Sequence, residues 1–383
     1  MAEGKTISRL EAAGALTLAA LASPAVAQDA IRIGSFLAVT GPAAFLGEPE
    51  KKTLELYVDR INGEGGVLGQ PLELVVYDTG MNAKDAVTFA KRLIEQDEVD
   101  AIIGGTTTGE TMAVVKLMEE AGIPFISLAG ASVIVDPVQK WVFKTPHTDR
   151  MAVDKVYEDM RKEGVAAIGL IGGAGGFDKS CLANAQELAD EHGLEIKANE
   201  TYGASDTDMT PQLTKIKNAG VDAVLFCGFG AASTIVTRTT PSSASSCRST
   251  TITAAARSSS STVPARRRKA CGCPAALLVA DQLPEEDPQK PVAKAYAEAY
   301  TATTGEEVST FGGHAYDALL LLSDAIQRAG STDPSAVRDA LEATDQLIGV
   351  DGIFTMSPDD HMGLSLESFK MLAVENGDWK YLY

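Results

Sequence analysis

Short apolar runs alternate with longer amphipathic segments along most of this chain, and this alternation limits the folds open to it. The apolar runs contain few polar residues, as is typical of strands buried on both faces of a parallel sheet. They span 31–36, 72–76, 101–103, 125–127, 166–171 and 223–227. Helical patterns occur at 50–62, 82–96, 109–120, 149–163, 181–191, 211–218, 291–303, 313–329 and 333–343. This order of elements predicts doubly wound α/β layers, followed by short strands over 352–383.

Size and charge exclude several classes of protein. The 383 residues predict two or three domains. The net charge of −19 argues against a nucleic-acid partner, because binding phosphates needs a basic surface. Five cysteines are too few and too badly spaced for a disulfide framework or a zinc site. The chain has no nucleophile-elbow or metalloprotease motif, and the glycine-rich run over 172–180 lacks phosphate-loop spacing, so we expect no enzyme, no cofactor and no metal.

The first 27 residues have the pattern of an export signal. Lys5 and Arg9 precede an apolar stretch over 12–22, and Ala25-Val26-Ala27 is the small-x-small pattern that a signal peptidase cleaves. The apolar stretch is too short to span a membrane. The alternative is an N-terminal amphipathic helix of the first domain. We favour a signal peptide over 1–27, which predicts a soluble mature protein in the periplasm.

The segment 239–274 breaks the pattern. It carries 9 Ser, 6 Thr, 5 Arg and 1 Lys with no acidic or aromatic residue, so its charge is +6. This composition predicts a segment that buries too little apolar area to fold. It is either a flexible linker or, as we favour, a translated frame error, because a shifted reading of 269–274 gives Glu-Gly-Val-Arg-Leu-Pro leading into a strand over 275–280. Sequencing the DNA across this segment distinguishes the two.

Several motifs are similar to those of a known family. The most specific is Ile61-Asn62-Gly63-Glu64-Gly65-Gly66-Val67-Leu68-Gly69. Thr40-Gly41-Pro42-Ala43-Ala44, Ile123-Pro124-Phe125-Ile126-Ser127 and Ala315-Tyr316-Asp317-Ala318 support it through their order and spacing. Together they resemble the type I periplasmic substrate-binding proteins of ABC importers, and within these the branched-chain amino-acid (Leu/Ile/Val)-binding family.

The resemblance implies two Rossmann-like α/β lobes joined by a three-strand hinge, with the ligand in the cleft between them. Lobe 1 would comprise 30–147 plus 283–350, and lobe 2 would comprise 148–282 plus 351–383. The anomalous segment 239–274 then falls inside lobe 2, where it replaces expected strands and helices rather than adding a loop.

Thr107 and Thr108 follow a predicted strand and open a helix. The free amides and positive end of such a helix suit a carboxylate, and in the family the hydroxyl residue that matches Thr108 binds the carboxylate of the ligand. The alternative is a threonine that only caps the helix. The next strand ends in Ala129-Gly130-Ala131-Ser132, where the family uses backbone groups and a hydroxyl. Ala131 takes the place of that hydroxyl residue, with Ser132 beside it, and the alternative is a tight turn.

Leu46, Phe177 and Phe229 match apolar or aromatic residues that face the ligand in the family, with core packing as the alternative role. The acid that holds the ammonium of an amino acid in the family would lie in 239–274, which has none. The ligand therefore lacks an ammonium, or the segment has lost the residue. The stretch 41–51 also resembles a branch of the family that takes aromatic carboxylates.

The resemblance implies a monomeric solute-binding component that closes on a branched-chain amino acid, or alternatively an aromatic carboxylate. It would deliver this ligand to an ABC permease in the inner membrane. Other interpretations are a periplasmic enzyme on the same fold, a ligand-sensing domain, or a non-functional product of a damaged reading frame.

Overall fold

The computed structural model describes residue 1 and residues 30–239, 248–252, 271–272, 277–375 and 378–382. The predicted signal peptide over 1–27 lies outside this part of the chain apart from its first residue. The strands are β1 (Ile31–Leu37), β2 (Leu72–Asp78), β3 (Ala101–Gly104), β4 (Phe125–Ser127), β5 (Val142–Lys144), β6 (Ala167–Gly172), β7 (Glu195–Thr201), β8 (Ala223–Cys227), β9 (Arg248–Ile252), β10 (Cys271–Gly272), β11 (Leu347–Ile348), β12 (Ile353–Phe354), β13 (Met371–Glu375) and β14 (Asp378–Tyr381).

The helices alternate with these strands as the sequence predicts. The α-helices are α1 (Ala44–Gly63), α2 (Ala83–Glu95), α3 (Thr108–Ala121), α4 (Asp149–Lys162), α5 (Gly176–Leu188), α6 (Thr210–Asn218), α7 (Ala231–Thr239), α8 (Gln289–Thr304), α9 (Thr310–Ala329) and α10 (Pro334–Glu342). The 3-10 helices are η1 (Gly41–Ala43), η2 (Ser132–Ile134), η3 (Leu277–Gln282) and η4 (Leu366–Ser368). Among the helices in the described ranges, none has the length and apolar character needed to cross a membrane.

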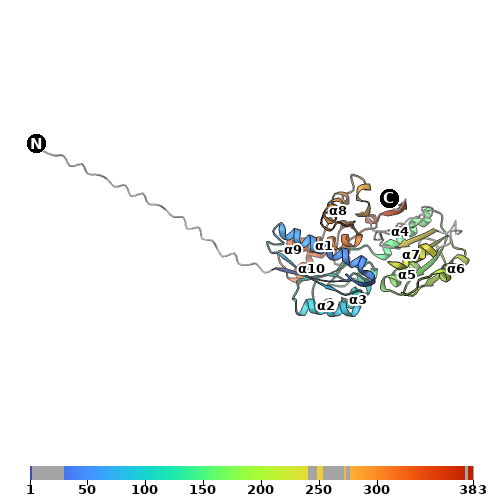
Figure 1. The fold of residues 1–383 in the computed structure, drawn as a ribbon, viewed down its shortest axis with the longest axis horizontal. Helices are drawn as coiled ribbons and strands as arrows, with labels where there is room; N and C mark the ends of the chain where they lie inside the picture. Colours follow the sequence, from blue (N-terminus) through green and yellow to red (C-terminus); the bar gives the residue numbers. More distant parts are fainter. Residues whose placement is uncertain (2–29, 240–247, 253–270, 273–276, 376–377, 383) are drawn as a thin grey trace.

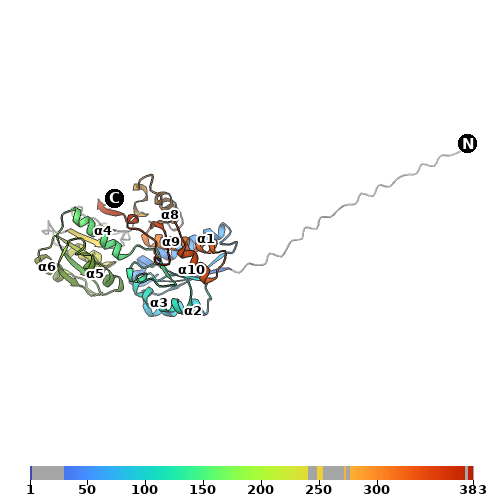
Figure 2. The ribbon, with the colours of Figure 1, turned by 180° about the vertical axis from the view of Figure 1, so that it is seen from behind.

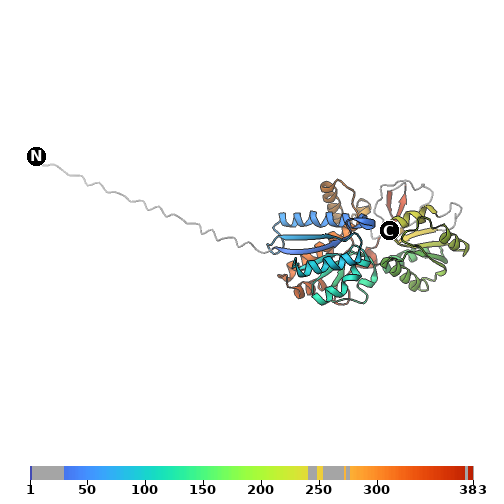
Figure 3. The same cartoon turned by 60° about the horizontal axis from the view of Figure 1, so that its bottom comes forward.

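Lobe 1 is built on a parallel sheet with the strand order β2-β1-β3-β4-β5. Side chains alternate between its two faces. Ile33 and Ile103 pack with α1, α9 and α10 on one face, while Phe36 and Ile102 pack with α2 and α3 on the other. Figure 3 shows this sheet with helices above and below it. The apolar strands predicted from the sequence are therefore buried on both sides.

Lobe 2 repeats the plan with the strand order β7-β6-β8-β9, also parallel. Helices α4 and α5 cover one face and α6 and α7 the other. Figures 1 and 2 show the two lobes side by side from opposite directions. The chain passes between the lobes at 145–148, between β10 and α8, and at 365–368, where η4 leads into Phe369 of the lobe 2 core.

The observed elements depart from the predicted ones where the local sequence pattern is weak. Strand β7, Glu195–Thr201, was not predicted because it contains no continuous apolar run. Every second residue of it is exposed, as at the edge of a sheet. Strand β5 was also not predicted, although it is as long as the predicted strand β4. Helix α1 begins at Ala44, before the predicted 50–62. The prediction began directly after Pro49, which lies inside the observed helix. Proline within a helix normally argues against one, but here it lies near the N-terminus.

Two predictions around the anomalous segment are wrong. Residues 277–280 of the strand predicted over 275–280 belong instead to the 3-10 helix η3, Leu277–Gln282. The segment 239–274 is also not wholly without structure, because Arg248–Ile252 pairs with β8 from Arg248 opposite Ala223 to Ile252 opposite Cys227. Backbone groups at a sheet edge can pair whatever the side chains are, and Thr and Ile favour strands. Residues 240–247, 253–270 and 273–276 lie outside the described residues.

The predicted division between the lobes remains a prediction. Packing assigns part of the C-terminal region differently from it: Phe354, Met356, Met362 and Leu364 belong to the lobe 1 core, although we placed 351–383 in lobe 2. By contrast, strand β13 pairs with β10 and β14 in a small antiparallel sheet.

A disulfide joins Cys181 of α5 to Cys227 of β8 inside the lobe 2 core. The cysteine count did not predict it, because a single bond needs no framework of cysteines. The two residues are 46 apart in the sequence. Replacing both with alanine should lower the free energy of unfolding by about 4 kcal/mol, through the entropy regained by the unfolded chain.

This loss is measured by urea unfolding of the two proteins without reductant. Dithiothreitol should destabilise the wild type and leave the double variant almost unchanged. Equal sensitivity of both proteins to the reductant would show that this bond does not stabilise lobe 2.

Candidate functional site

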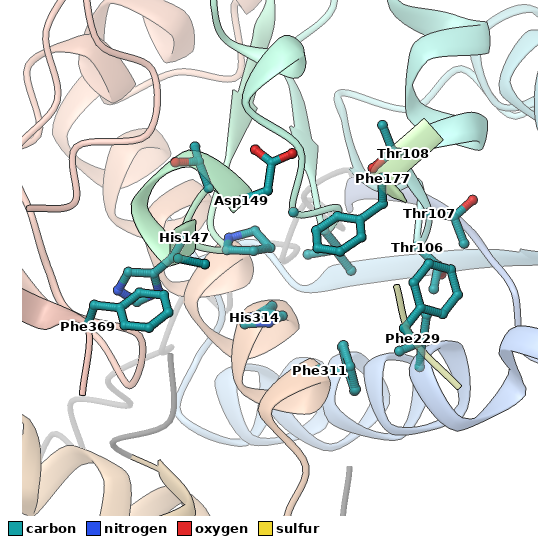
Figure 4. Close-up of a pocket in the computed structure, with 16 residues that line it drawn as sticks. Thr106, Thr107, Thr108, His147, Asp149, Phe177, Phe229, Phe311, His314 and Phe369 are labelled. Carbon is teal, nitrogen blue, oxygen red and sulfur yellow. The ribbon is translucent and has the colours of Figure 1, made fainter. Parts of the chain in front are cut away.

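A pocket lies between the two lobes, with about 700 Å³ of space between its walls when its open mouth is included. Its lining combines lobe 1, lobe 2 and the segments that cross between them. The lining residues are Leu46, Thr106, Thr107, Thr108, Leu128, Gly130, Pro146, His147, Thr148, Asp149, Ala152, Phe177, Phe229, Phe311, His314 and Phe369. Figure 4 shows Thr107 and Thr108 on one side of the pocket, and His147 and Phe369 on the other.

The N-terminus of α3 forms one wall. Strand β3 ends at Gly104, and the next residue, Gly105, has a φ of +70° that turns the chain sharply toward the helix. Thr107 is the N-cap: it donates to the Glu110 carboxylate at 2.7 Å and accepts from the Glu110 amide. Thr106 donates to Glu50 at 2.5 Å and accepts from the Ala38 amide at 3.0 Å. Both hydroxyls are therefore engaged within the protein.

Thr108 differs from these two neighbours. Its Oγ1 is buried and has no hydrogen-bond partner among the residues that the structure describes. Because Thr107 caps the helix, the alternative that Thr108 serves only as a cap is wrong. The first amides of an α-helix also lack intrahelical acceptors, and the helix dipole favours negative charge there. This wall can therefore offer a hydroxyl and backbone amides to a small anion.

Glu50 does not oppose an anion at this wall. Burial raises the pKa of Glu50 well above its ordinary range, and the nearby Glu110 raises it further. Burial thus favours the uncharged form of the Glu50 carboxyl, whose Oε2 accepts a hydrogen bond from the Thr106 hydroxyl.

The structure brings six of the nine predicted contact residues to the pocket. These six are Leu46, Thr107, Thr108, Gly130, Phe177 and Phe229. Ala129 and Ala131 pack instead into the lobe 1 core with α2 and α3. At Gly130, an added Cβ would come within 3.2 Å of the Phe177 ring, so glycine allows lobe 2 to approach this turn.

Ser132 does not line the pocket but joins the lobes. Its Oγ accepts a hydrogen bond from Asn184 Nδ2 of α5 at 3.0 Å, and its amide donates to Asp149 Oδ1 at 2.8 Å. Asn184 also donates to Asp149 Oδ1 at 3.0 Å, and Ser180 lies 3.4 Å from Ser132. We call Ser132, Asp149, Ser180 and Asn184 the interlobe network. It holds the turn after β4 against α5 of lobe 2.

Aromatic rings also meet across the cleft. The Phe45 ring of α1 lies 6.5 Å from Phe229 and 6.0 Å from Phe311, while Phe177 lies 6.1 Å from Phe229. Sequence reasoning missed Phe311 and Phe369, because each lies in a segment that reaches the pocket only in the folded chain. Ring contacts and hydrogen bonds therefore join the two lobes.

The sequence analysis did not identify the polar groups at the side of the pocket near the crossing segments. His147, Asp149 and His314 line the pocket there, and the Lys144 side chain is fully buried nearby. His314 Nδ1 lies 2.7 Å from Asp351 Oδ2. A usable signal was present, since polar residues directly after β5 stand at the carboxyl edge of a parallel sheet, where ligands bind in α/β folds.

Burial dominates the ionisation of these groups. It raises the pKa of Asp149 and lowers the pKa of Lys144 to about 7. It also holds the pKa of His147 well below its ordinary value, helped by His314, Lys144 and Lys370. Within the described ranges, no three His, Cys, Asp or Glu residues cluster as metal ligands do. The predicted lack of a metal or cofactor stays a prediction.

Comparison with known sequences gives three matches of note. The sequence model of the family described as "Periplasmic binding protein" matches residues 30–368. A leucine-, isoleucine-, valine-, threonine- and alanine-binding protein from Pseudomonas aeruginosa is 27% identical over 341 residues, which is 88% of each chain. A Leu/Ile/Val-binding protein homologue from Brucella abortus is 29% identical over 232 residues, which is 58% of each chain.

Solved structures share the fold. An extracellular ligand-binding receptor from Rhodopseudomonas palustris matches with a TM-score of 0.83 at 26% identity, over 93% of this chain and all (100%) of that one. A substrate-binding protein of a branched-chain amino acid transporter from Streptococcus pneumoniae, solved with isoleucine, has a TM-score of 0.78 at 24% identity, over 92% of this chain and 99% of that one. The predicted two-lobed α/β fold is confirmed.

The buried Lys144 predicts a pH-dependent stability. Its pKa is about 7 in the folded protein and near 10.4 in an unfolded chain, so between these values only the unfolded chain binds the proton. Lys144 therefore destabilises the fold most below pH 7, and this effect is relieved as pH rises toward 10. Lys144→Met should stabilise the protein more at about pH 6 than at about pH 10, by up to about 4 kcal/mol.

Urea unfolding of both proteins across this range measures the difference, with the exposed Lys91→Met as control. A stability difference between Lys144→Met and the wild type that stays constant with pH would contradict the lowered pKa.

Proposed function

The chain belongs to the periplasmic binding protein family, of the branched-chain amino acid transporter type, and on this basis we propose that it is the solute-binding component of an ABC importer. The observation that carries the proposal is the unpartnered, buried Thr108 hydroxyl at the start of α3, on the wall of a pocket between two lobes. Members of this family bind substrates rather than transform them. The ligand that suits this wall is a small carboxylate.

The body of the ligand is apolar. Beyond the threonines, the pocket offers Leu46, Leu128, Phe177 and Phe229, which can cover an aliphatic side chain. The P. aeruginosa relative is named for binding leucine, isoleucine, valine, threonine and alanine, and the S. pneumoniae structure holds isoleucine. A branched-chain amino acid is therefore the first ligand class to test.

An aromatic carboxylate is the second candidate. Four phenylalanines line the pocket, namely Phe177, Phe229, Phe311 and Phe369. Aromatic rings pack favourably edge-to-face or offset against one another, which adds to the stabilisation from burial alone. A flat aromatic acid would make such contacts with several of these rings at once.

Hinge closure would couple binding to transport. An open form would hold the carboxylate on lobe 1 through Thr108, and lobe 2 would then bring Phe177 and Phe229 onto the ligand. The interlobe network and these rings would provide the difference in affinity between the open and closed forms. The closed form would be the one that an inner-membrane permease recognises, with the protein working as a monomer in the periplasm after loss of residues 1–27.

Isothermal titration calorimetry with leucine, isoleucine, valine and benzoate tests the proposal directly. One of these ligands should bind, and Thr108→Val should weaken its binding by about 10- to 100-fold, because a hydrogen bond to a charged group is lost. Thr108→Ser keeps the hydroxyl and should stay within about threefold of the wild type. Lack of binding by all four ligands, in the protein as written and with 239–274 repaired, would refute the proposal.

The interlobe network should influence affinity without touching the ligand. Asn184→Ala removes the two hydrogen bonds that reach Ser132 and Asp149, so the closed form should lose stability relative to the open form. We expect a dissociation constant up to about tenfold higher, since affinity falls with the fraction of the closing-competent form. Small-angle X-ray scattering should show a larger radius of gyration without ligand.

Asn199→Ala is the matched control, because Asn199 is exposed on β7 of the same lobe. If Asn184→Ala matched this control in both affinity and shape, the network would have no part in closure.

A further inference from the structure

His147 is a buried histidine that the carboxylate-binding wall does not involve. It lies in the segment that crosses from β5 to α4, is 4% exposed, and lines the pocket. Figure 4 shows it beside Phe369, on the side of the pocket opposite Thr107 and Thr108, with Asp149 between them in this view. Its position makes it a candidate contact for the far end of a ligand.

The hydrogen bonds of Ser368 determine which nitrogen of His147 carries the proton. The Ser368 hydroxyl donates its only proton to the Ser365 carbonyl at 2.6 Å. Its oxygen also lies 2.8 Å from His147 Nε2. Since Ser368 has no second proton to give, Nε2 must donate to it. His147 therefore carries a proton on Nε2.

The other ring nitrogen is then left as an acceptor. Burial and the nearby positive charges of Lys144 and Lys370 keep the His147 ring neutral, so Nδ1 holds a lone pair and no proton. Nδ1 is buried and has no partner among residues 30–239, 277–375 and the shorter described stretches. A buried acceptor without a donor is unfavourable and requires an explanation.

A second unpartnered acceptor lines the same pocket. Asp149 Oδ1 accepts from Ser132 and Asn184, but Oδ2 is buried and has no partner in the part of the chain that the structure describes. The hydrogen bond of the buried Lys144 ammonium goes to the Pro146 carbonyl, and none from Lys144 reaches Asp149 Oδ2 in the described residues. The pocket thus has donors at the α3 wall and unused acceptors near the crossing segments.

We propose that His147 is a specificity-determining residue whose Nδ1 accepts a hydrogen bond from the ligand, so that the pocket prefers a carboxylate that also carries a donor group. The donor is an ammonium or a hydroxyl, and both groups offer the same N–H or O–H chemistry. The inference rests on the proposed function. It would also remove the need for an acid within 239–274, because His147 and Asp149, which carry the unpartnered acceptors, line the pocket.

Matched ligand pairs test the proposal by calorimetry on the full chain. Leucine is compared with 4-methylpentanoate, which lacks only the ammonium, and 4-hydroxybenzoate with benzoate, which lacks only the hydroxyl. In at least one pair, the donor-bearing member should bind about tenfold or more tightly to the wild type, and the pair that responds identifies the donor.

Two substitutions separate recognition from structure. His147→Gln can keep a donor near Nε2 for Ser368 but has no atom at Nδ1, so it should abolish the preference and leave the other member within about twofold. His147→Asn can place its amide oxygen near the Nδ1 position and should restore part of the preference. His192→Gln is the control, because His192 pairs with Asp154 and does not line the pocket.

Equal affinities within both pairs in the wild type would overturn the inference while leaving the proposed function intact. Equal weakening of both members by His147→Gln would show a purely structural role and would also overturn it. If none of these ligands binds, and isoleucine and valine do not bind either, the proposed function itself fails. Should the variants not fold, nitrogen NMR of isotope-labelled histidine in the wild type decides the matter, because a protonated Nδ1 without ligand, or an Nδ1 signal unmoved by the donor-bearing ligand, would refute it.

Discussion

Both lobes are built on parallel sheets whose two faces are covered by helices, so the faces of each sheet are apolar. Polar side chains that can meet a ligand therefore lie where the strands end. At the carboxyl end of β3 the chain turns through Gly105 into α3, and at the end of β5 it crosses toward α4. These two ends face the same pocket, one through Thr108 and the other through His147. The fold thereby places hydrogen-bond donors and acceptors on opposite sides of an otherwise apolar space.

The sequence predicts elements well where one local pattern dominates. Strands β4 and β8 match the predicted ranges, because runs such as Ala223–Cys227 are apolar and every residue of both strands is buried. It fails where tertiary position decides. The alternating pattern of β7 reflects its place at a sheet edge, and Leu277–Gln282 forms a 3-10 helix although its composition suits a strand. Strand β9 depends on backbone pairing with β8, which composition cannot reveal.

The candidate site likewise contains some residues that a local motif identifies and others whose role depends on distant parts of the chain. Thr108, Gly130, Phe177 and Phe229 follow strands at positions that a local motif identifies, and all line the pocket. Ser132 stands two positions after Gly130, which lines the pocket, yet its hydroxyl faces α5, because Asn184 approaches from the other lobe. His147 carries no motif of its own. Its proposed role as an acceptor depends on Ser368, which lies 221 positions later in the chain.

The disulfide connects two parts of lobe 2 that matter for closure. Cys181 belongs to α5, the helix that also carries Phe177 at its start and Asn184 about one turn after Cys181. Cys227 precedes Phe229 by two residues. One covalent bond therefore ties together the backbone beneath both aromatic rings and the donor to Ser132. Formation of this bond in an oxidising compartment would then stabilise the folded state. It would also fix the position of α5 relative to the end of β8, and so the shape of the side of lobe 2 that we propose closes on the ligand.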